Sequence, residues 1–200
     1  MTPALLSLAA VGFQAGIAAL LVVSVRRGNG AATVNGVVSL AASLAPAVLT
    51  AALVRGGSTA VALDPALPFW LAVAGFLHTY GMLGPYETVW WWDHLTHTVS
   101  AALLAALVYA LVLVSGDYAP PMAASLTLLL TLGLGGVWEV LELVAREVGD
   151  RYGVEPVLVH YGWRDTAYDL VFDAVGTLLV LAVDLRIFVP AVEQVWIALG

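Results

Sequence analysis

The chain contains no cysteine and no lysine among its 200 residues, and only 10% of its residues are charged. The lack of cysteine excludes disulfide bonds and thiolate ligands, so a bound metal would need histidine or carboxylate ligands. The seven cationic residues are all arginines, and 14 acidic residues bring the net charge to −7. This acidic balance argues against nucleic acid as a partner. An acidic, lysine-free chain rich in alanine and valine also has a halophile-like composition.

Hydrophobic residues make up 62% of the chain, well above the roughly 45–50% of soluble domains. Apolar runs of about 20 residues, the length that crosses a bilayer, recur along it. We therefore predict an all-α fold, a polytopic membrane helix bundle of about six transmembrane helices in one membrane domain over residues 1–200. The predicted spans cover about residues 4–25, 33–54, 66–83, 93–114, 121–148 and 165–188.

Arginines predict how the chain sits in the cell membrane. The loops after the first, third and fifth spans hold Arg26, Arg27, Arg146, Arg151 and Arg164, whereas the opposite side holds only Arg55 and Arg186. Because cytoplasmic loops carry an excess of basic residues, both termini are predicted outside. The first span has no basic residue before it, which disfavours a cleavable signal peptide.

Titratable side chains gather at the ends of four predicted spans that meet at one membrane face. These are the C-terminal ends of spans three and five and the N-terminal ends of spans four and six. The cluster consists of His78, Asp93, His94, His97, Glu139, Glu142, Asp165, Asp169 and Asp173. Ionisable side chains inside a membrane turn toward the bundle interior or a water-filled cavity, because contact with lipid is costly. We expect one shared site at the cytoplasmic face.

The spacing within each span supports a shared site. The His-x-x-His pair of the fourth span and the Glu-x-x-Glu pair of the fifth each lie about 60° apart around their helix, and the Asp-x-x-x-Asp steps of the sixth only about 40°. Six carboxylates in a partly dry site cannot all stay ionised without positive charge. Three ways to compensate the carboxylates are open: a bound cation, protonation of some of them, or pairing with Arg146 or Arg164.

A metal is the leading answer, because imidazoles and carboxylates on facing helices suit zinc, manganese or iron. The predicted ligands are His94, His97, Glu142, Asp165 and Asp169. In this hypothesis Glu139 is the catalytic general base, and the protein acts on a lipid-linked or amphiphilic substrate by metal-assisted hydrolysis or transfer. Two residues have structural alternatives, since His78 suits a packed, hydrogen-bonded interior histidine and Asp165 suits a helix cap.

Two non-enzymatic functions stay open. The acids could form a cation or proton route, although residues 178–183, beyond Asp173, are apolar. They could also only fix helix packing in a structural or accessory membrane subunit. A homo-oligomer and a larger membrane complex are both compatible with the composition, with membrane lipid as the surrounding partner. The loop over residues 149–164 suits either a lid over the polar site or an interfacial connector.

Three motifs in a fixed order carry a resemblance to a known family. They are Asp93-His94-Leu95-Thr96-His97, Trp138-Glu139-x-x-Glu142 and Tyr161-Gly162-Trp163-Arg164-Asp165-Thr166-x-x-Asp169. This ordered set resembles the YjdF-like small integral membrane proteins and is more distantly similar to VanZ-like proteins, over roughly residues 70–185. The resemblance implies a multi-helix membrane protein in which the acids and histidines of these motifs are signature positions. It implies no catalytic mechanism, and Asp173 lies outside the family pattern.

Overall fold

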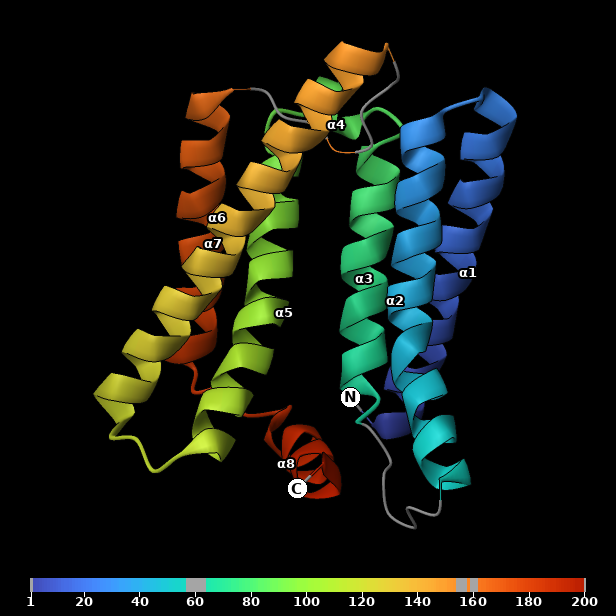
Figure 1. Cartoon of the computed structure of the whole chain (residues 1–200). Coiled ribbons are helices and arrows are strands. Elements are labelled where there is room, and N and C mark those ends of the chain that lie inside the picture. Colours follow the sequence, from blue (N-terminus) through green and yellow to red (C-terminus); the bar gives the residue numbers. More distant parts are fainter. Residues whose placement is uncertain (1, 57–63, 154–157, 159–161, 200) are drawn as a thin grey trace.

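The computed structural model describes residues 2–56, 64–153, 158 and 162–199, and within them the chain is all-α, as predicted (Figure 1). The helices are α1 (Pro3–Arg27), α2 (Gly30–Arg55), α3 (Ala66–Gly81), α4 (Pro85–Thr88), α5 (Trp92–Ser115), α6 (Pro120–Tyr152), α7 (Trp163–Ala182) and α8 (Val189–Leu199). Among the described residues, four stretches are long and apolar enough to cross a membrane: Pro3–Arg27, Gly30–Ala52, Trp92–Ser115 and Pro120–Tyr152.

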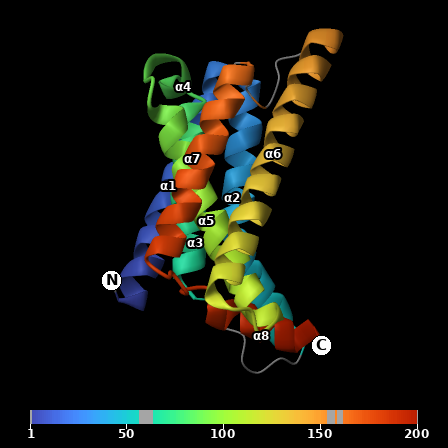
Figure 2. The ribbon, with the colours of Figure 1, turned by 90° about the vertical axis from the view of Figure 1, so that its left-hand side faces the viewer.

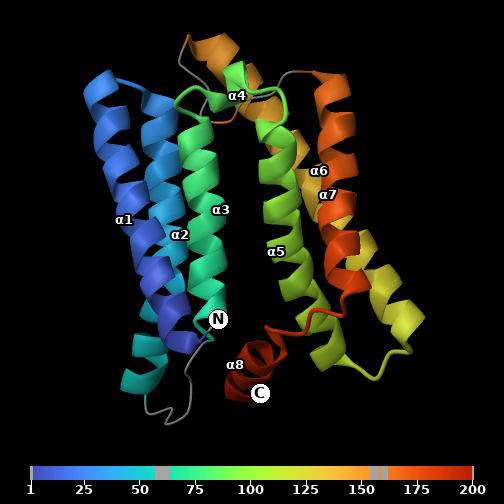
Figure 3. The same cartoon turned by 180° about the vertical axis from the view of Figure 1, so that it is seen from behind.

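The long helices form two groups of three. Helices α1, α2 and α3 lie side by side in one group, and α5, α6 and α7 form the other, as Figures 1 and 3 show from opposite sides. The short helix α4 joins the groups at one end, and α8 lies at the opposite end, near both termini (Figure 1). The view in Figure 2 shows α6 leaning away from the other long helices at its C-terminal end. The ends of α3 and α6 and the starts of α5 and α7 thus share one end of the molecule.

Glycine and capping residues set the turns that the sequence predicts. Gly28 ends α1 with a φ of 67°, a left-handed conformation that glycine adopts without a steric penalty. Asn29 then begins α2, because its side chain accepts a hydrogen bond from the Ala32 amide at 2.8 Å. The predicted break at residues 84–87 contains the single-turn helix α4, which starts after Gly84 with a φ of 141°.

The C-terminal part of the chain differs from the prediction, because α7 ends at Ala182 rather than near residue 188. Asp184 turns the chain with a φ of 49°, which a helix cannot continue through. Its carboxylate accepts hydrogen bonds from the Tyr109 hydroxyl at 2.6 Å and from Arg186 Nε at 2.8 Å. Those bonds, from Arg186 first, hold the pKa of the Asp184 carboxyl below its usual value. The chain then continues into α8.

Small residues allow α7 to pack closely on α5. A side chain at Gly176 would collide with the Thr98 carbonyl oxygen and with the Ala102 amide nitrogen at 2.9 Å. Both are backbone atoms of α5, which cannot move aside as a flexible side chain could. This close approach matches the use of small residues between membrane helices. It brings the acids of α7 against the start of α5.

One face of α6 is small or polar, and the rest is apolar and exposed. The buried face carries residues at steps of three or four: Ala123, Thr127, Thr131, Gly135, Glu139 and Glu142. The exposed leucines and valines around it, such as Leu129 and Val140, suit contact with lipid. A hydrophobic exterior around a polar stripe is what a membrane bundle requires, and it directs both glutamates into the protein.

Candidate functional site

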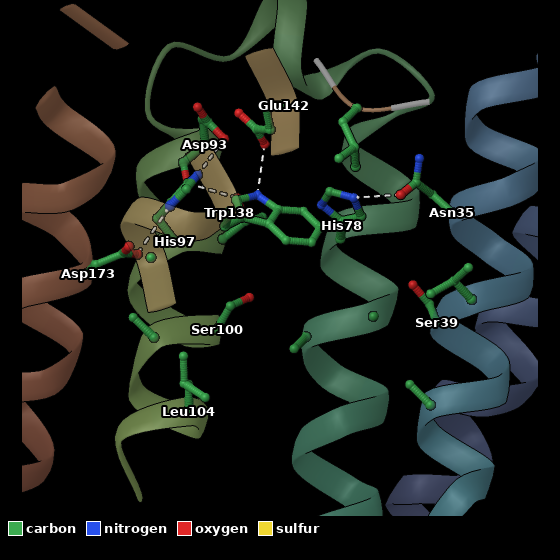
Figure 4. A pocket seen from close by; sticks show the side chains of 18 of the residues that line it. Asn35, Ser39, His78, Asp93, His97, Ser100, Leu104, Trp138, Glu142 and Asp173 are labelled. Atoms are coloured by element: carbon green, nitrogen blue, oxygen red, sulfur yellow. Dashed lines mark hydrogen bonds and ion pairs between the residues drawn. The ribbon is translucent and has the colours of Figure 1, made fainter. Parts of the chain in front are cut away.

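His97 occupies the centre of the candidate site, between two helices. Its Nε2 atom lies 3.8 Å from an oxygen of Asp93, one turn earlier on α5, and 3.6 Å from an oxygen of Asp169 on α7. Its Nδ1 atom lies 3.1 Å from an oxygen of Asp173, one turn further along α7 (Figure 4). The imidazole therefore has a carboxylate partner at one nitrogen and two carboxylates in front of the other.

The contact with Asp173 differs in kind from the other two. At 3.1 Å it is a hydrogen bond, in which Nδ1–H donates to the carboxylate. The distances of 3.6 and 3.8 Å from Nε2 exceed those of N–H···O hydrogen bonds in proteins. With its proton on Nδ1, a neutral His97 turns the lone pair of Nε2 toward Asp93 and Asp169.

These three residues form a group of ligand atoms. One atom each from Asp93, His97 and Asp169 lies within 4.8 Å of the other two. Asp169 is only 1% exposed, and its Oδ1 atom has no hydrogen-bond partner in the part of the chain that the structure describes. A buried carboxylate oxygen without a partner is costly, so an ion or a proton must compensate it.

The two glutamates of α6 have different surroundings. Glu142 accepts a hydrogen bond from the indole Nε1 of Trp138 at 2.8 Å and lines a cavity. Glu139 is 3% exposed and does not line that cavity, and no described residue completes a hydrogen bond to its oxygens. The Thr166 hydroxyl on α7, also without a hydrogen bond, is close to Glu139. Glu142 is thus the glutamate that a cavity ligand can reach.

The cavity lies between the two helix groups and has a volume of about 390 Å³, within the range of small-molecule sites. At the α4 end its wall is polar, with Asp93, His97, Glu142, Asp173, His78 and Asn35 (Figure 4). Away from that end the wall becomes apolar, with residues such as Leu71, Leu104 and Leu134. The group around His97 therefore opens onto a space with one polar and one apolar end.

His78 faces the cavity from the opposite wall and belongs to a separate network. Its Nε2 lies 3.0 Å from Asn35 Oδ1 on α2, and its Nδ1 lies 2.7 Å from the Tyr86 hydroxyl on α4. The Asn35 amide nitrogen donates to the Ala31 carbonyl at 2.9 Å, which leaves Oδ1 to accept from His78. Both ring nitrogens are thus used in hydrogen bonds, as in the interior-histidine alternative.

The structure does not bring His94 and Asp165 into the group of ligand atoms. The His94 ring stacks on Phe172, with centroids 4.3 Å apart and planes at 11°, and faces Tyr168 and Trp90. Asp165 lies in the first turn of α7, where an acidic side chain suits the helix dipole. The three residues that the structure brings together with His97 are Asp93, Asp169 and Asp173.

The two arginines considered as partners for the acids have other neighbours. Arg146 Nε lies 4.0 Å from Asp150 on an exposed part of α6, and the Arg164 guanidinium lies 5.5 Å from the Trp163 ring centroid. Of the segment considered as a lid, residues 149–164, residues 154–157 and 159–161 lie outside the described residues. Of that segment, Leu158 lines the cavity.

Several cavity residues are absent from the sequence-based site. Ser39, Tyr86, Ser100, Thr131 and Trp138 all line the cavity. Thr131 had a usable signal, because it lies on the same face of α6 as Gly135 and Glu139 at steps of four residues. Trp138 belongs to the Trp138-Glu139-x-x-Glu142 motif, and Ser100 follows His97 by three residues on α5. Ser39 and Tyr86 have no such signal, since only the packing of α2 and α4 against α3 and α5 brings them to the same space.

A multi-pass membrane helix bundle with a buried His/Asp/Glu site is thus the class that the fold and the site define. The chain matches the family model described as "Predicted membrane protein (DUF2238)" over residues 9–189. It belongs to this family of predicted membrane proteins. No curated protein and no solved structure matches the chain.

Proposed function

We propose that this protein is a membrane-embedded divalent-metal-binding protein whose ligands are His97 Nε2, Asp93 and Asp169. The observation that supports the proposal is the arrangement of His97, with Asp173 on Nδ1 and two carboxylates in front of Nε2. Metal-ligating histidines commonly donate their other ring N–H to a carboxylate, which fixes the tautomer and the ring orientation. One nitrogen and two oxygen donors suit zinc, manganese or iron, and leave positions for water or substrate.

The unpartnered Asp169 oxygen supports the same proposal. A carboxylate that only fixed helix packing would be expected to close its hydrogen bonds within the bundle. Asp169 Oδ1 instead faces His97 at 3.6 Å without a hydrogen bond among the described residues. Cation coordination at that oxygen would offset its burial.

We further propose that six helices cross the membrane, with α3 and α7 spanning beside the four longer apolar stretches. Both run alongside the long helices of their groups (Figures 1 and 3). Arginines 26, 27, 146, 151 and 164 then lie at the end that carries the site, which favours a cytoplasmic site and both termini outside.

Metal-assisted hydrolysis or transfer on an amphiphilic, lipid-linked substrate is the chemistry that fits this site. A divalent metal at His97 would polarise a substrate oxygen or lower the pKa of a bound water. Glu142 lines the cavity and would accept the proton, a role for which buried Glu139 is less accessible. The apolar end of the cavity would hold the substrate's hydrocarbon part.

Elemental analysis of protein purified in neutral detergent tests the metal proposal. Wild type is expected to carry close to one zinc, manganese or iron ion per chain, and Asp169→Asn and His97→Ala to carry much less. Asp117→Asn, in the exposed turn between α5 and α6, is the matched control and should keep the metal. Equal metal content in wild type and both site variants, after exposure to each ion, would overturn the proposal.

The competing function is a metal-free structural network in which a protonated His97 pairs with its three aspartates. The same contacts favour it, since each lies within 4.0 Å of an imidazole nitrogen. Thermal unfolding with and without a chelator separates the two. A metal site predicts a lower unfolding temperature after chelation and its recovery on adding the ion, whereas the network predicts no change.

A further inference from the structure

We infer that the cavity binds a single-chain amphiphile with a cationic amine head group, which lies against Glu142 and Trp138. This inference rests on the proposed function in taking the cavity as the substrate site, and it names the class of substrate. It concerns the cavity wall beside the metal ligands, so binding can be measured with and without the ion.

The shape of the cavity fits a head group and one hydrocarbon chain. On α5 the lining runs from Asp93 to Leu104, eleven residues further along the helix. At 1.5 Å per residue this is a depth of roughly 16 Å. The polar residues come first, from the α4 end, and Leu104 lies at the other end of the wall (Figure 4). Such a cavity separates a polar head from an apolar tail.

The charge of the wall selects the sign of the head group. The lining includes Asp93, Glu142 and Asp173, and no arginine is among the described lining residues. His78 lies on the opposite wall, where its two ring nitrogens are hydrogen-bonded to the Tyr86 hydroxyl and to Asn35 Oδ1. An anionic head group would face the acidic side chains of this wall, whereas a cationic one would be attracted to them.

A bound divalent ion would leave this preference in place. The carboxylates of Asp93, Asp169 and Asp173 surround His97, and those of Glu139 and Glu142 come from α6. An ion held by His97, Asp93 and Asp169 would leave the carboxyl groups of α6 without a metal contact. Glu142, the one of these that meets the cavity, would stay open to a cationic head group.

Trp138 supplies the second recognition element for an amine. Its indole Nε1 donates to Glu142 Oε1 at 2.8 Å, which fixes the ring at the cavity wall beside the carboxylate (Figure 4). An aromatic face next to a carboxylate is the combination that attracts ammonium groups, through the ring quadrupole and through charge. Tyr86 adds a second aromatic ring to the lining.

Thr131 is an independent sign that the cavity receives a ligand. Its side chain is 1% exposed and lines the cavity, but its hydroxyl has no hydrogen-bond partner among the described residues. Thr127, one turn earlier, instead donates to the Ala123 carbonyl at 2.8 Å. A buried hydroxyl left unpaired at a cavity wall is expected to bond to a ligand or to a water held with it.

The test compares head groups on one chain length. Wild-type protein in nanodiscs of zwitterionic lipid is titrated calorimetrically with dodecyltrimethylammonium, dodecyl phosphate and dodecyl maltoside, each below its micelle-forming concentration. We expect saturable binding of the ammonium amphiphile with a Kd at least about tenfold below that of the phosphate. Tighter binding of the phosphate, or no saturable ammonium binding, would overturn the inference.

Variants assign the preference to named residues. Glu142→Gln keeps an acceptor for Trp138 and should reduce the ammonium preference by about tenfold, as should Trp138→Leu. Leu104→Trp fills the apolar end and should abolish binding of all three probes. Glu147→Gln, an exposed glutamate on the same helix, is the matched control and should bind as wild type does. An unchanged preference in folded Glu142→Gln, judged by its unfolding temperature, would also overturn the inference.

Measuring the same binding in Asp169→Asn separates the inference from the metal proposal. Loss of metal with retained ammonium binding supports both. Wild-type protein that holds metal but shows no ammonium preference defeats the inference alone. Wild-type protein that binds the ammonium probe but never holds metal defeats the metal proposal alone.

Discussion

The two groups of helices bury polar side chains of different kinds. In the α1–α3 group the buried polar residues are neutral: Ser24, Asn35, Ser39, Ser43 and Thr79. In the α5–α7 group they include four carboxylates, Glu139, Glu142, Asp169 and Asp173, each at most 7% exposed. Both groups are surrounded by exposed apolar side chains. Only the second therefore has to compensate charge in its interior.

The first group closes its hydrogen bonds within the bundle. Gln14 donates to the Ser43 carbonyl at 3.1 Å, and Asn29 donates to the Met82 carbonyl at 3.3 Å. In the second group, oxygens of Glu139 and Asp169 lack such bonds within the described chain. The comparison indicates that the α1–α3 group is a scaffold, while the carboxylates of the other group are arranged for a ligand.

The largest expected effect comes from the close contact between α5 and α7. Gly176→Val would push a side chain into the α5 backbone at Thr98 and Ala102. Because the backbone cannot move aside locally, we expect the free energy of unfolding to fall by about 3 kcal/mol, or the variant not to fold. Thermal unfolding in detergent measures it. Gly136→Val, where nothing lies within 4 Å, is the control, and an equal loss there would contradict the explanation.

The next effect is on metal affinity. Asp173→Ala removes the acceptor that orients His97, and outer-shell partners of this kind are worth about 10–100-fold in affinity. Asp173→Asn keeps an acceptor oxygen, so its metal affinity should fall much less. Titration of the purified protein with the ion gives both dissociation constants. If Asp173→Ala binds as tightly as wild type, Asp173 does not act through His97.

A smaller effect is expected in the network between α2 and α3. Asn35→Leu leaves His78 Nε2 without its acceptor, which should lower the free energy of unfolding by about 1 kcal/mol. Metal content should not change, because the metal ligands lie on α5 and α7. Ser125→Ala, at an exposed position on α6, serves as the control for stability. A loss of metal in Asn35→Leu would show that the two groups are coupled.

The smallest effect concerns pH at the α8 end. Hydrogen bonds from Arg186 and Tyr109 lower the pKa of Asp184 in the folded protein. A lowered pKa contributes stability above the unfolded value of about 3.9, and that contribution disappears as pH falls through the folded value. The unfolding temperature of wild type relative to Asp184→Asn should therefore fall slightly below about pH 4. A constant difference from pH 6 to pH 2 would contradict this.

The helices were largely predictable because apolar runs and turn residues are local signals. The Gly28-Asn29 turn and the start of α3 at Ala66 match the expected bounds. The end of α7 was not predictable, since Asp184 is held in its turn by Tyr109, which lies 75 residues earlier. Local hydropathy continues to favour a helix there, but the hydrogen bond from the distant Tyr109 stabilises a turn instead.

The candidate site was predictable as a set of acids and histidines at one end of the bundle. Helical spacing placed His94 and His97 on neighbouring positions, but it did not show which of the two meets the acids of α7. His97 faces Asp169 and Asp173, while His94 stacks on Phe172. That choice depends on the rotation of α5 against α7, which the contact at Gly176 sets.

The composition and the spacing of apolar runs were enough to establish an all-α, multi-pass membrane protein, because a bilayer imposes length and hydropathy on every span. They also placed the acids toward the interior, because lipid excludes charge. Helix packing alone decided which carboxylates share His97, which glutamate meets the cavity and where Trp138 and Thr131 lie. These depend on rotations and crossings between helices far apart in sequence, for which a single chain carries no local signal.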